Sequence, residues 1–330
     1  MRFVLVAMLV AVPAFAQDKP KEKPKALPRI AINDPEKLKE DADFALQGEY
    51  EGMNGEAKYG VQVVAQGEGH FVAKFLAGGL PGAGWDGKTE LSLPAKRDGS
   101  AATFLPRTSS GTIEVGKITV SDTRGLKGTF AKVERKSPTM GAKPPTGAVV
   151  LFAGPGDESQ WAGGKLVELS DGKFLNAGIK SKQSFDAFTA HIEFRLPWMP
   201  NSRGQGRGNS GFYVQDRYEI QVLDSFGLKG ENNECGGVYT QFAPKVNMCL
   251  PPMAWQTYDI TFAPAAFDGD KKTGPAKLTL KHNGVVVHDA VELKGPTGGG
   301  QPESAKPGPI QLQNHGDPLV FRNVWAVEAK

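Results

Sequence analysis

The sequence predicts an all-β protein in which a small antiparallel β-domain precedes a larger β-sandwich. The chain has 330 residues, enough for two domains of ordinary size. Its 41 glycines and 24 prolines make up about a fifth of the residues, which favours many turns and short strands over long helices. Short runs of alternating apolar and polar residues recur along most of the chain, without helical periodicity.

Composition and charge exclude several classes of protein. Hydrophobic residues make up 39% of the chain and charged residues 23%, which fits a packed interior and argues against disorder. The 39 basic residues nearly balance the 36 acidic ones, so the net charge is only +3. Proteins that bind nucleic acid usually concentrate basic charge, and we therefore expect no nucleic-acid partner. The same composition excludes a helical bundle and a coiled coil, and it gives no indication of oligomeric state.

The N-terminus has the features of a secretory signal peptide. Arg2 supplies a positive charge, residues 3–12 are apolar, and Ala14-Phe15-Ala16 forms a small-residue cleavage site. The apolar run is shorter than the roughly 20 residues that span a bilayer, and no other run approaches that length. We therefore expect residues 1–16 to be removed and the protein to be exported to the periplasm or the cell exterior, with no membrane span. A buried N-terminal helix is the alternative.

Four further segments are expected after the signal peptide. Residues 17–43 are rich in lysine and proline, which predicts an extended leader. Residues 44–136 contain strand-like runs between glycine turns and are predicted to form the small β-domain, to which the sequence assigns no role. Residues 137–147 are dominated by proline and glycine, which predicts a linker. Residues 148–330 contain many alternating strands, as a two-sheet β-sandwich requires.

The chain has two cysteines, Cys235 and Cys249. An oxidising compartment would favour a disulfide between them, and closing a loop of this length contributes about 3 kcal/mol when the geometry is unstrained. Two free thiols are the alternative. A zinc site is not indicated, because no histidine has the required spacing to the pair.

The polar faces of the sandwich strands point to a function. Residues 218–222 place Glu219 and Gln221 on the face opposite Ile220 and Val222, and residues 310–315 align Gln311, Gln313 and His315. Such planar, multidentate hydrogen-bonding groups suit the neighbouring hydroxyls of a sugar. An ordinary solvated sheet face is the alternative.

A resemblance to a known family becomes specific over the second domain, from about residue 151 to the C-terminus. The matching segments together closely resemble the 3-keto-disaccharide hydrolase domain family, although each alone is a weak signal. This family implies a jelly-roll sandwich similar to the concanavalin A-like lectins and glucanases, and it says nothing about the first domain. The segments are Gly208–Tyr213, Arg217–Ser225, Glu234–Tyr239, Asn247–Pro252, Trp255–Ile260, Gly308–Gly316 and Phe321–Trp325.

The resemblance implies an exported enzyme that cleaves glycosides or disaccharides oxidised at C3, by removal of the C2 proton and elimination of the glycosidic oxygen. His315, whose type titrates nearest neutral pH, suits the general base. Glu219 and Asp224 are the other predicted catalytic residues. With His315, they are also the predicted ligands of a divalent cation, calcium or another, since carboxylates favour hard cations. The alternatives are that His315 caps a turn and that Asp224 is a structural turn residue.

Further residues are expected to hold the sugar. The related glucanases carry a Glu-x-Asp-x-Glu pattern, whereas this chain has Gln221 between Glu219 and Asp224, which argues against an ordinary pair of catalytic carboxylates. A non-catalytic carbohydrate-binding protein and an exported scaffold are the alternative functions. The predicted sugar-binding residues are Gln221, Gln313, Arg217, Arg322, Asn209 and Tyr239.

Overall fold

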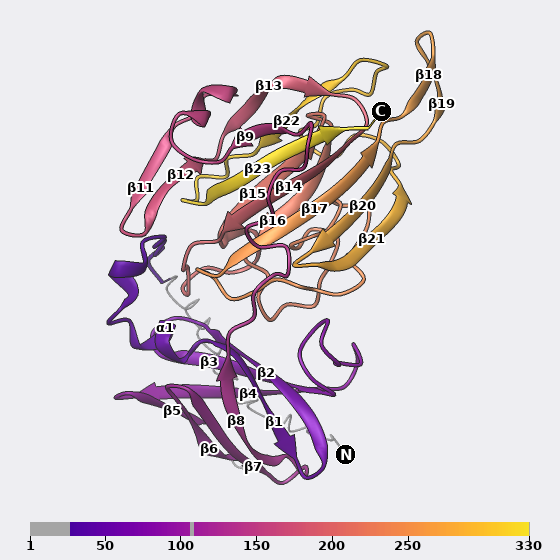
Figure 1. Cartoon of the computed structure of the whole chain (residues 1–330). Helices are drawn as coiled ribbons and strands as arrows, with labels where there is room; N and C mark the ends of the chain where they lie inside the picture. The colour runs from indigo at the N-terminus through magenta and orange to yellow at the C-terminus, as the bar shows by residue number, and fades with distance from the viewer. Residues whose placement is uncertain (1–26, 106–108, 330) are drawn as a thin grey trace, which may run out of the picture.

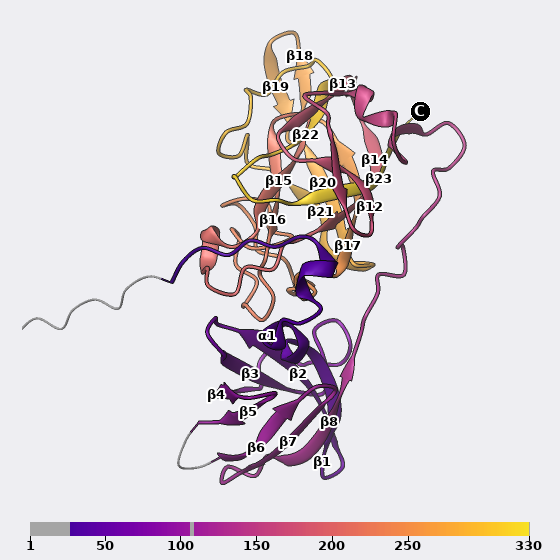
Figure 2. The ribbon, with the colours of Figure 1, turned by 90° about the vertical axis from the view of Figure 1, so that its left-hand side faces the viewer.

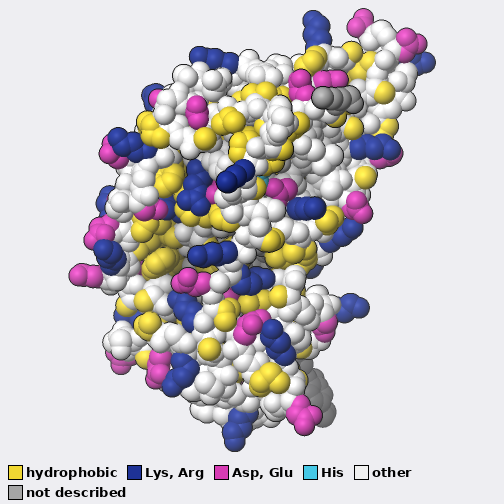
Figure 3. Space-filling view, in the orientation of Figure 1, with side chains coloured by type: hydrophobic (Ala, Val, Ile, Leu, Met, Phe, Trp, Pro, Cys, Tyr) yellow, Lys and Arg dark blue, Asp and Glu magenta, His cyan; other side chains and the backbone are white. Residues whose placement is uncertain are grey.

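The computed structural model describes residues 27–105 and 109–329. The predicted signal peptide and residues 17–26 of the leader lie outside the described residues. Figure 1 shows the two predicted β-domains, with the smaller one below the larger, and their antiparallel sheets confirm the all-β fold class. No helix within the described ranges is long and apolar enough to cross a bilayer. On the face seen in Figure 3, acidic and basic side chains are interspersed, in keeping with the small net charge.

The small domain is a closed antiparallel barrel of eight strands in sequential order, in which the first strand pairs with the last. Alternate residues such as Val61, Val63, Phe75 and Phe130 fill its interior, because successive side chains of a strand point to opposite faces. The strands are β1 (Gly48–Asn54), β2 (Ala57–Ala65), β3 (His70–Ala77), β4 (Glu90–Asp98), β5 (Ala101–Phe104), β6 (Ser109–Glu114), β7 (Lys117–Asp122) and β8 (Lys127–Val133).

The described part of the leader does not form the free tether that its composition predicted. Ile32 pairs with Trp198 of the second domain through backbone hydrogen bonds of 3.0 and 2.7 Å, and a 3₁₀-helix η1 (Pro35–Leu38) and a helix α1 (Ala42–Leu46) follow. Leu38 and Trp198 are buried together in the hydrophobic cluster of the barrel. In Figure 2 this segment runs across the base of the sandwich towards the barrel. Burial of these apolar side chains outweighs the tendency of proline and charge to keep a chain extended.

The second domain is a sandwich of a five-stranded and an eight-stranded sheet, as predicted. The five-stranded sheet has the order β10-β13-β22-β15-β16, and the other has the order β11-β12-β23-β14-β17-β20-β21, with β9 also paired to β23. Side chains from both sheets form one hydrophobic core between them. A two-stranded hairpin, β18-β19, and the short helices η2 (Asp157–Gln160) and η3 (Gly204–Gly206) lie outside this path.

The sandwich strands are β9 (Val149–Phe152), β10 (Trp161–Ala162), β11 (Leu166–Leu169), β12 (Gly172–Asn176), β13 (Ile179–Phe185), β14 (Phe188–Arg195), β15 (Asn209–Val214), β16 (Tyr218–Leu223), β17 (Trp255–Ala263), β18 (Ala266–Asp268), β19 (Lys271–Gly274), β20 (Lys277–His282), β21 (Val285–Glu292), β22 (Gly308–Leu312) and β23 (Val320–Glu328).

The predicted linker, residues 137–147, is bound along the outer face of the eight-stranded sheet. The Thr139 hydroxyl donates to Asp259 at 2.7 Å, and the backbone N–H of Gly141 donates to Glu193 at 2.6 Å. Glu193 is fully buried and also accepts from Arg322 at 2.7 Å and Asn323 at 2.9 Å. The linker is therefore clamped to the second domain by a buried carboxylate.

This clamp predicts that Glu193→Gln destabilises the protein. Burial alone would raise the pKa of Glu193, but hydrogen bonds from His191, Asn323, Gly141 and Arg322 outweigh it and lower the pKa to about 2. A lowered carboxyl pKa stabilises the fold above the unfolded value near 4.5, and the contribution disappears as the pH falls towards 2. We expect Glu193→Gln to lower the free energy of unfolding at pH 7 by about 3 kcal/mol, as measured in urea. An equal loss at pH 7 and pH 2.5 would contradict this account.

The predicted disulfide is not formed, because Cys235 and Cys249 are both free, buried thiols. The Cys235 sulfur lies 3.1 Å from the Tyr258 hydroxyl, and the Cys249 sulfur lies 3.6 and 3.5 Å from the carbonyls of Leu223 and Leu250. Burial raises the pKa of Cys249. Since the thiolate is the form that reacts, burial makes Cys249 the less reactive of the two thiols, whereas at Cys235 the effect of burial is outweighed by hydrogen bonds from Cys249 and Tyr258, which lower its pKa.

Candidate functional site

The polar face of the five-stranded sheet gathers several of the predicted site residues. Strands β15 and β16 form a hairpin in which Tyr213 lies opposite Glu219 and Gly211 lies opposite Gln221. The intervening residues, Phe212 among them, point into the hydrophobic core, so strand alternation directs these side chains to the other face. Glu219 is only 3% exposed and Gln221 only 1%. A buried carboxyl and a buried amide therefore share one face.

Glu219 is held in a water-poor setting with one hydrogen-bond donor. The Tyr213 hydroxyl donates to its Oε2 at 2.9 Å. Gly211 is required beside it, because a Cβ at that position would overlap the Glu219 carboxyl group. Burial raises the pKa of Glu219 to about 7, and the hydrogen bond from Tyr213 only partly opposes this shift. A carboxyl that titrates near neutral pH is suited to general acid–base chemistry.

Neutral amides lie on the same polar face as this carboxyl. Gln313 Nε2 donates to the Tyr213 hydroxyl at 3.2 Å, and Gln221 Nε2 donates to Asn209 Oδ1 at 3.2 Å. The Oε1 atoms of Gln221 and Gln313 are buried, and neither has a hydrogen-bond partner within the described structure. An unsatisfied buried acceptor costs about 1–3 kcal/mol, so a ligand hydroxyl that donated to these atoms would be stabilised. We call Glu219, Tyr213, Gln221, Asn209 and Gln313 the inner cluster.

A surface hollow of about 410 Å³ lies beside the inner cluster. Gln205 lines this hollow and also hydrogen bonds to Asn209 and Gln221, so it separates the two. His315, the predicted base, is an exposed residue beyond the end of β22 and lines this hollow instead of joining the inner cluster. The other lining residues are Leu27, Arg29, Ser202, Arg203, Gly206 and Asp317.

Asp224 does not join Glu219 either. It follows the end of β16, is fully buried, and forms an ion pair with Arg207 at 2.8 Å. Burial raises the pKa of Asp224, and the Arg207 charge opposes this shift. Glu219, Asp224 and His315 therefore do not form the predicted metal site, and the described residues contain no group of three or more acidic, histidine or cysteine side chains placed to hold a metal ion. The partner that the structure gives Asp224 is Arg207.

The two arginines predicted to hold the sugar have structural partners. Arg217 donates to the Gln215 side chain at 2.6 Å and to the Lys306 carbonyl at 2.9 Å, so it fastens a neighbouring loop. Arg322 lies on the outer face of the eight-stranded sheet, where it bonds to Glu193. Tyr239 lies at the margin of the inner cluster, near Gly298, and its backbone N–H donates to the Glu219 carbonyl at 3.0 Å.

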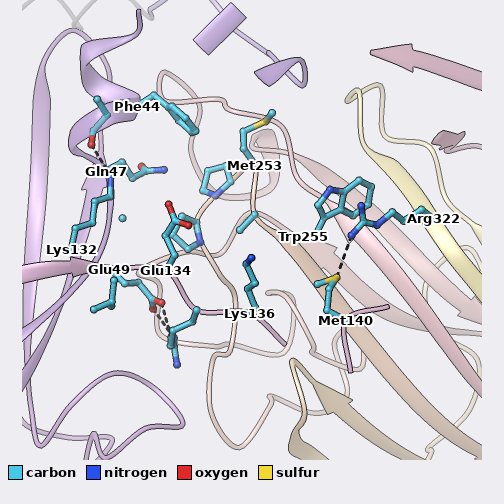
Figure 4. A pocket seen from close by; sticks show the side chains of 17 residues that line it. Phe44, Gln47, Glu49, Lys132, Glu134, Lys136, Met140, Met253, Trp255 and Arg322 are labelled. Atoms are coloured by element: carbon cyan, nitrogen blue, oxygen red, sulfur yellow. Dashed lines mark hydrogen bonds and ion pairs between the residues drawn. The ribbon is translucent and has the colours of Figure 1, made fainter. Parts of the chain in front are cut away.

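Arg322 instead lines a separate pocket of about 470 Å³ between the two domains. Figure 4 shows Arg322 and Trp255 on one side of this pocket and Gln47 and Lys132 on the other. The Arg322 guanidinium lies 4.0 Å from the centre of the Trp255 ring, and Lys132 donates to the Ala45 carbonyl at 2.7 Å. Gln47 Nε2 also lines this pocket and is buried without a hydrogen-bond partner among the described residues, and none of the inner cluster lines it.

Two residues of the site escaped sequence reasoning. Tyr213 could have been found, since it alternates with Asn209 and Gly211 in a run just before the β16 strand. Gln205 lies in the single-turn 3₁₀-helix η3 of a glycine-rich segment, which is too short for periodicity to indicate which way a side chain points.

Comparison with known proteins supports the resemblance seen in the sequence. Residues 147–327 match the family described as the 3-keto-alpha-glucoside-1,2-lyase-like domain. A crystal structure of a candidate glycosyl hydrolase from Parabacteroides distasonis ATCC 8503 is 32% identical, covering 56% of this chain and 85% of that chain with a TM-score of 0.49. No curated protein matches the chain.

Two further candidate glycosyl hydrolases from the same organism are more distant. One is 19% identical over 55% of this chain and 99% of its own, with a TM-score of 0.38. The other is 18% identical over 58% of this chain and 93% of its own, with a TM-score of 0.35. The family match spans more than half of the 330 residues and coincides with the sandwich that carries the inner cluster. The chain therefore belongs to the 3-keto-alpha-glucoside-1,2-lyase-like domain family, a family of carbohydrate-acting proteins.

Proposed function

We propose that this protein cleaves glycosides whose sugar is oxidised at C3, by removing the C2 proton and eliminating the glycosidic oxygen. The observation that carries the proposal is Glu219, a buried carboxyl with a pKa of about 7 among neutral hydrogen-bonding groups. Membership of the family supports the choice of substrate. The predicted signal peptide supports a location for this reaction in the periplasm or outside the cell.

The proposed reaction uses Glu219 as the general base. The C3 carbonyl acidifies the hydrogen on C2, and the Glu219 carboxylate takes that proton to leave an enolate over C2, C3 and the keto oxygen. The C3 carbonyl then re-forms, a C1=C2 double bond forms, and the C1–O bond to the leaving group breaks. The departing oxygen takes up a proton and leaves as the free alcohol. Addition of water across C1=C2 completes net hydrolysis.

This route suits the site better than an ordinary glycosidase mechanism does. Glycosidases generally need two carboxyl groups facing one glycosidic bond. The second acidic residue of this segment, Asp224, lies beyond the end of β16 and is paired with Arg207. The residue between Asp224 and Glu219 that shares the face of Glu219 is Gln221, an amide. The proposal takes no step through a divalent cation, because the three predicted ligands do not converge.

His315 receives a different role from the one expected. It lies in the outer hollow, separated by Gln205 from the inner cluster that holds Glu219. We assign it to the side of the site where the leaving group lies, as a proton donor to the departing oxygen. A protonated imidazole can donate a proton to a leaving group in this way.

Incubation with 4-nitrophenyl 3-keto-glucoside tests the proposal. We expect the wild-type protein to release 4-nitrophenol from this compound and not from the unoxidised 4-nitrophenyl glucoside. Spontaneous elimination is measured in the same buffer without protein. Binding of the keto compound without release would instead support a lectin-like protein that holds carbohydrate without turnover.

A further inference from the structure

Gln205 places a carbonyl oxygen within reach of two buried amide donors. Its Oε1 accepts from Gln221 Nε2 at 3.1 Å and from Asn209 Nδ2 at 3.2 Å. Asn209 and Gln221 are each only 1% exposed, whereas Gln205 is an exposed residue. The two donors thus form a preformed receptor for one carbonyl oxygen, and a surface side chain occupies it.

We propose that Gln205 is a plug, whose side-chain carbonyl occupies the position that the keto oxygen of the substrate takes during the reaction. This inference rests on the proposed function for the identity of the substrate. When Gln205 leaves, Gln221 and Asn209 can both donate to the keto oxygen. They would then stabilise the negative charge that develops there after proton removal, as the donors of an oxyanion hole do.

Gln205 is the middle residue of the short 3₁₀-helix η3, and Asn209 Nδ2 also donates to its backbone carbonyl at 3.0 Å, so the plug is its side chain alone. On one side, Arg203 donates to the carbonyls of Pro200 at 2.8 Å and Gln66 at 2.6 Å. On the other, Arg207 forms the buried ion pair with Asp224. Gly204 and Gly206 lie between these two anchors and Gln205, and glycine carries no Cβ to restrict rotation about the backbone.

The outer hollow provides the space into which the plug can withdraw. Gln205 already lines this hollow of about 410 Å³, together with His315 and Asp317. Its Nε2 donates to the Asn233 carbonyl at 2.7 Å, which holds the side chain in the plugged position. A sugar that entered from the hollow would meet Gln205 before it reached Gln221. The plug therefore competes with the substrate for the same two donors.

Competition of this kind predicts opposite effects for two substitutions. Gln205→Ala removes the competing carbonyl, so we expect KM for 4-nitrophenyl 3-keto-glucoside to fall about tenfold with little change in kcat. Gln205→Glu supplies a charged acceptor, which binds amide donors more strongly, so we expect KM to rise about tenfold. A side chain that only stabilised the loop would raise KM or lower kcat when shortened to alanine.

Binding is measured separately from turnover by calorimetry with the 3-keto derivative of 1,5-anhydroglucitol, an analogue that has no group at C1 to eliminate. We expect Gln205→Ala to bind the analogue most tightly, the wild type less tightly and Gln205→Glu most weakly. Gln183→Ala is the matched control, because Gln183 is exposed on β13 and takes no part in the site. We expect it to bind like the wild type.

The possible outcomes distinguish a failure of the plug proposal from a failure of the proposed function. If the wild type binds the analogue and cleaves nothing while Gln205→Ala binds more tightly, the plug stands and the proposed cleavage fails. If the wild type cleaves the substrate and Gln205→Ala binds no more tightly, the plug is overturned alone. If no variant binds the keto compound, the receptor does not exist and both are overturned.

Discussion

Glu219→Gln is expected to lower kcat/KM for a 3-keto-glucoside by at least about 100-fold, because it removes the general base and keeps the shape of the side chain. Glu56→Gln, the same change at an exposed position in the barrel, is the matched control and should act like the wild type. Retention of more than a tenth of the activity by Glu219→Gln would show that another group takes the proton.

The pH dependence of the same variant gives an independent check. Burial raises the pKa of Glu219 to about 7, and the carboxylate is the active form, so wild-type kcat/KM should fall as the pH drops below 7. A raised carboxyl pKa also means that Glu219 costs folding stability as the pH rises from the unfolded value near 4.5 to about 7. Glu219→Gln should therefore have a higher Tm than the wild type at pH 8 and lose this advantage at pH 5. Equal Tm differences at both values would contradict the raised pKa.

Arg207→Met is expected to cause the largest loss of stability. Asp224 is fully buried and pairs with Arg207, so the substitution leaves a buried carboxylate without its counter-charge. Removing one partner of such a pair typically costs about 3–5 kcal/mol, which urea unfolding at pH 7 would measure. The loop that carries Gln205 also loses one of its two anchors.

A double variant controls for the change in size at position 207. Arg207→Met combined with Asp224→Asn removes both charges, and we expect it to recover a substantial part of the lost stability. If the double variant were no more stable than Arg207→Met alone, the loss would arise from packing, and the ion pair would not be the reason that Asp224 is buried.

Strand alternation predicted Glu219, Gln221 and Gln313 of the inner cluster, and it failed for His315 and Asp224. Glu219 and Gln221 were placed on one face because β16 is regular and its other face meets the core. His315 and Asp224 lie beyond the ends of β22 and β16, where a period of two no longer applies. Arg322 also lies on a polar face, but on that of the other sheet. Alternation identifies the face of a strand and gives no information about which sheet the strand joins.

The segments around the domains were misread for a related reason. Lysine, proline and glycine suggested a free leader and a free linker, whereas a few side chains determine how both pack. Leu38 is buried in the barrel cluster, and Thr139 bonds to Asp259 on the sandwich. Partners that lie more than a hundred residues away along the chain leave no local pattern in the sequence.

The most direct test of the account follows the hydrogen on C2. A 3-keto-glucoside deuterated at C2 is incubated with the protein, and the deuterium in the sugar product is measured by mass spectrometry, corrected for exchange without protein. Removal of this hydrogen by Glu219 predicts loss of the label to water and a lower kcat/KM for the deuterated compound, because the C–D bond breaks more slowly. A sugar product that retained all the deuterium with an unchanged kcat/KM would mean that the C1–O bond breaks without proton removal at C2, which would contradict the account.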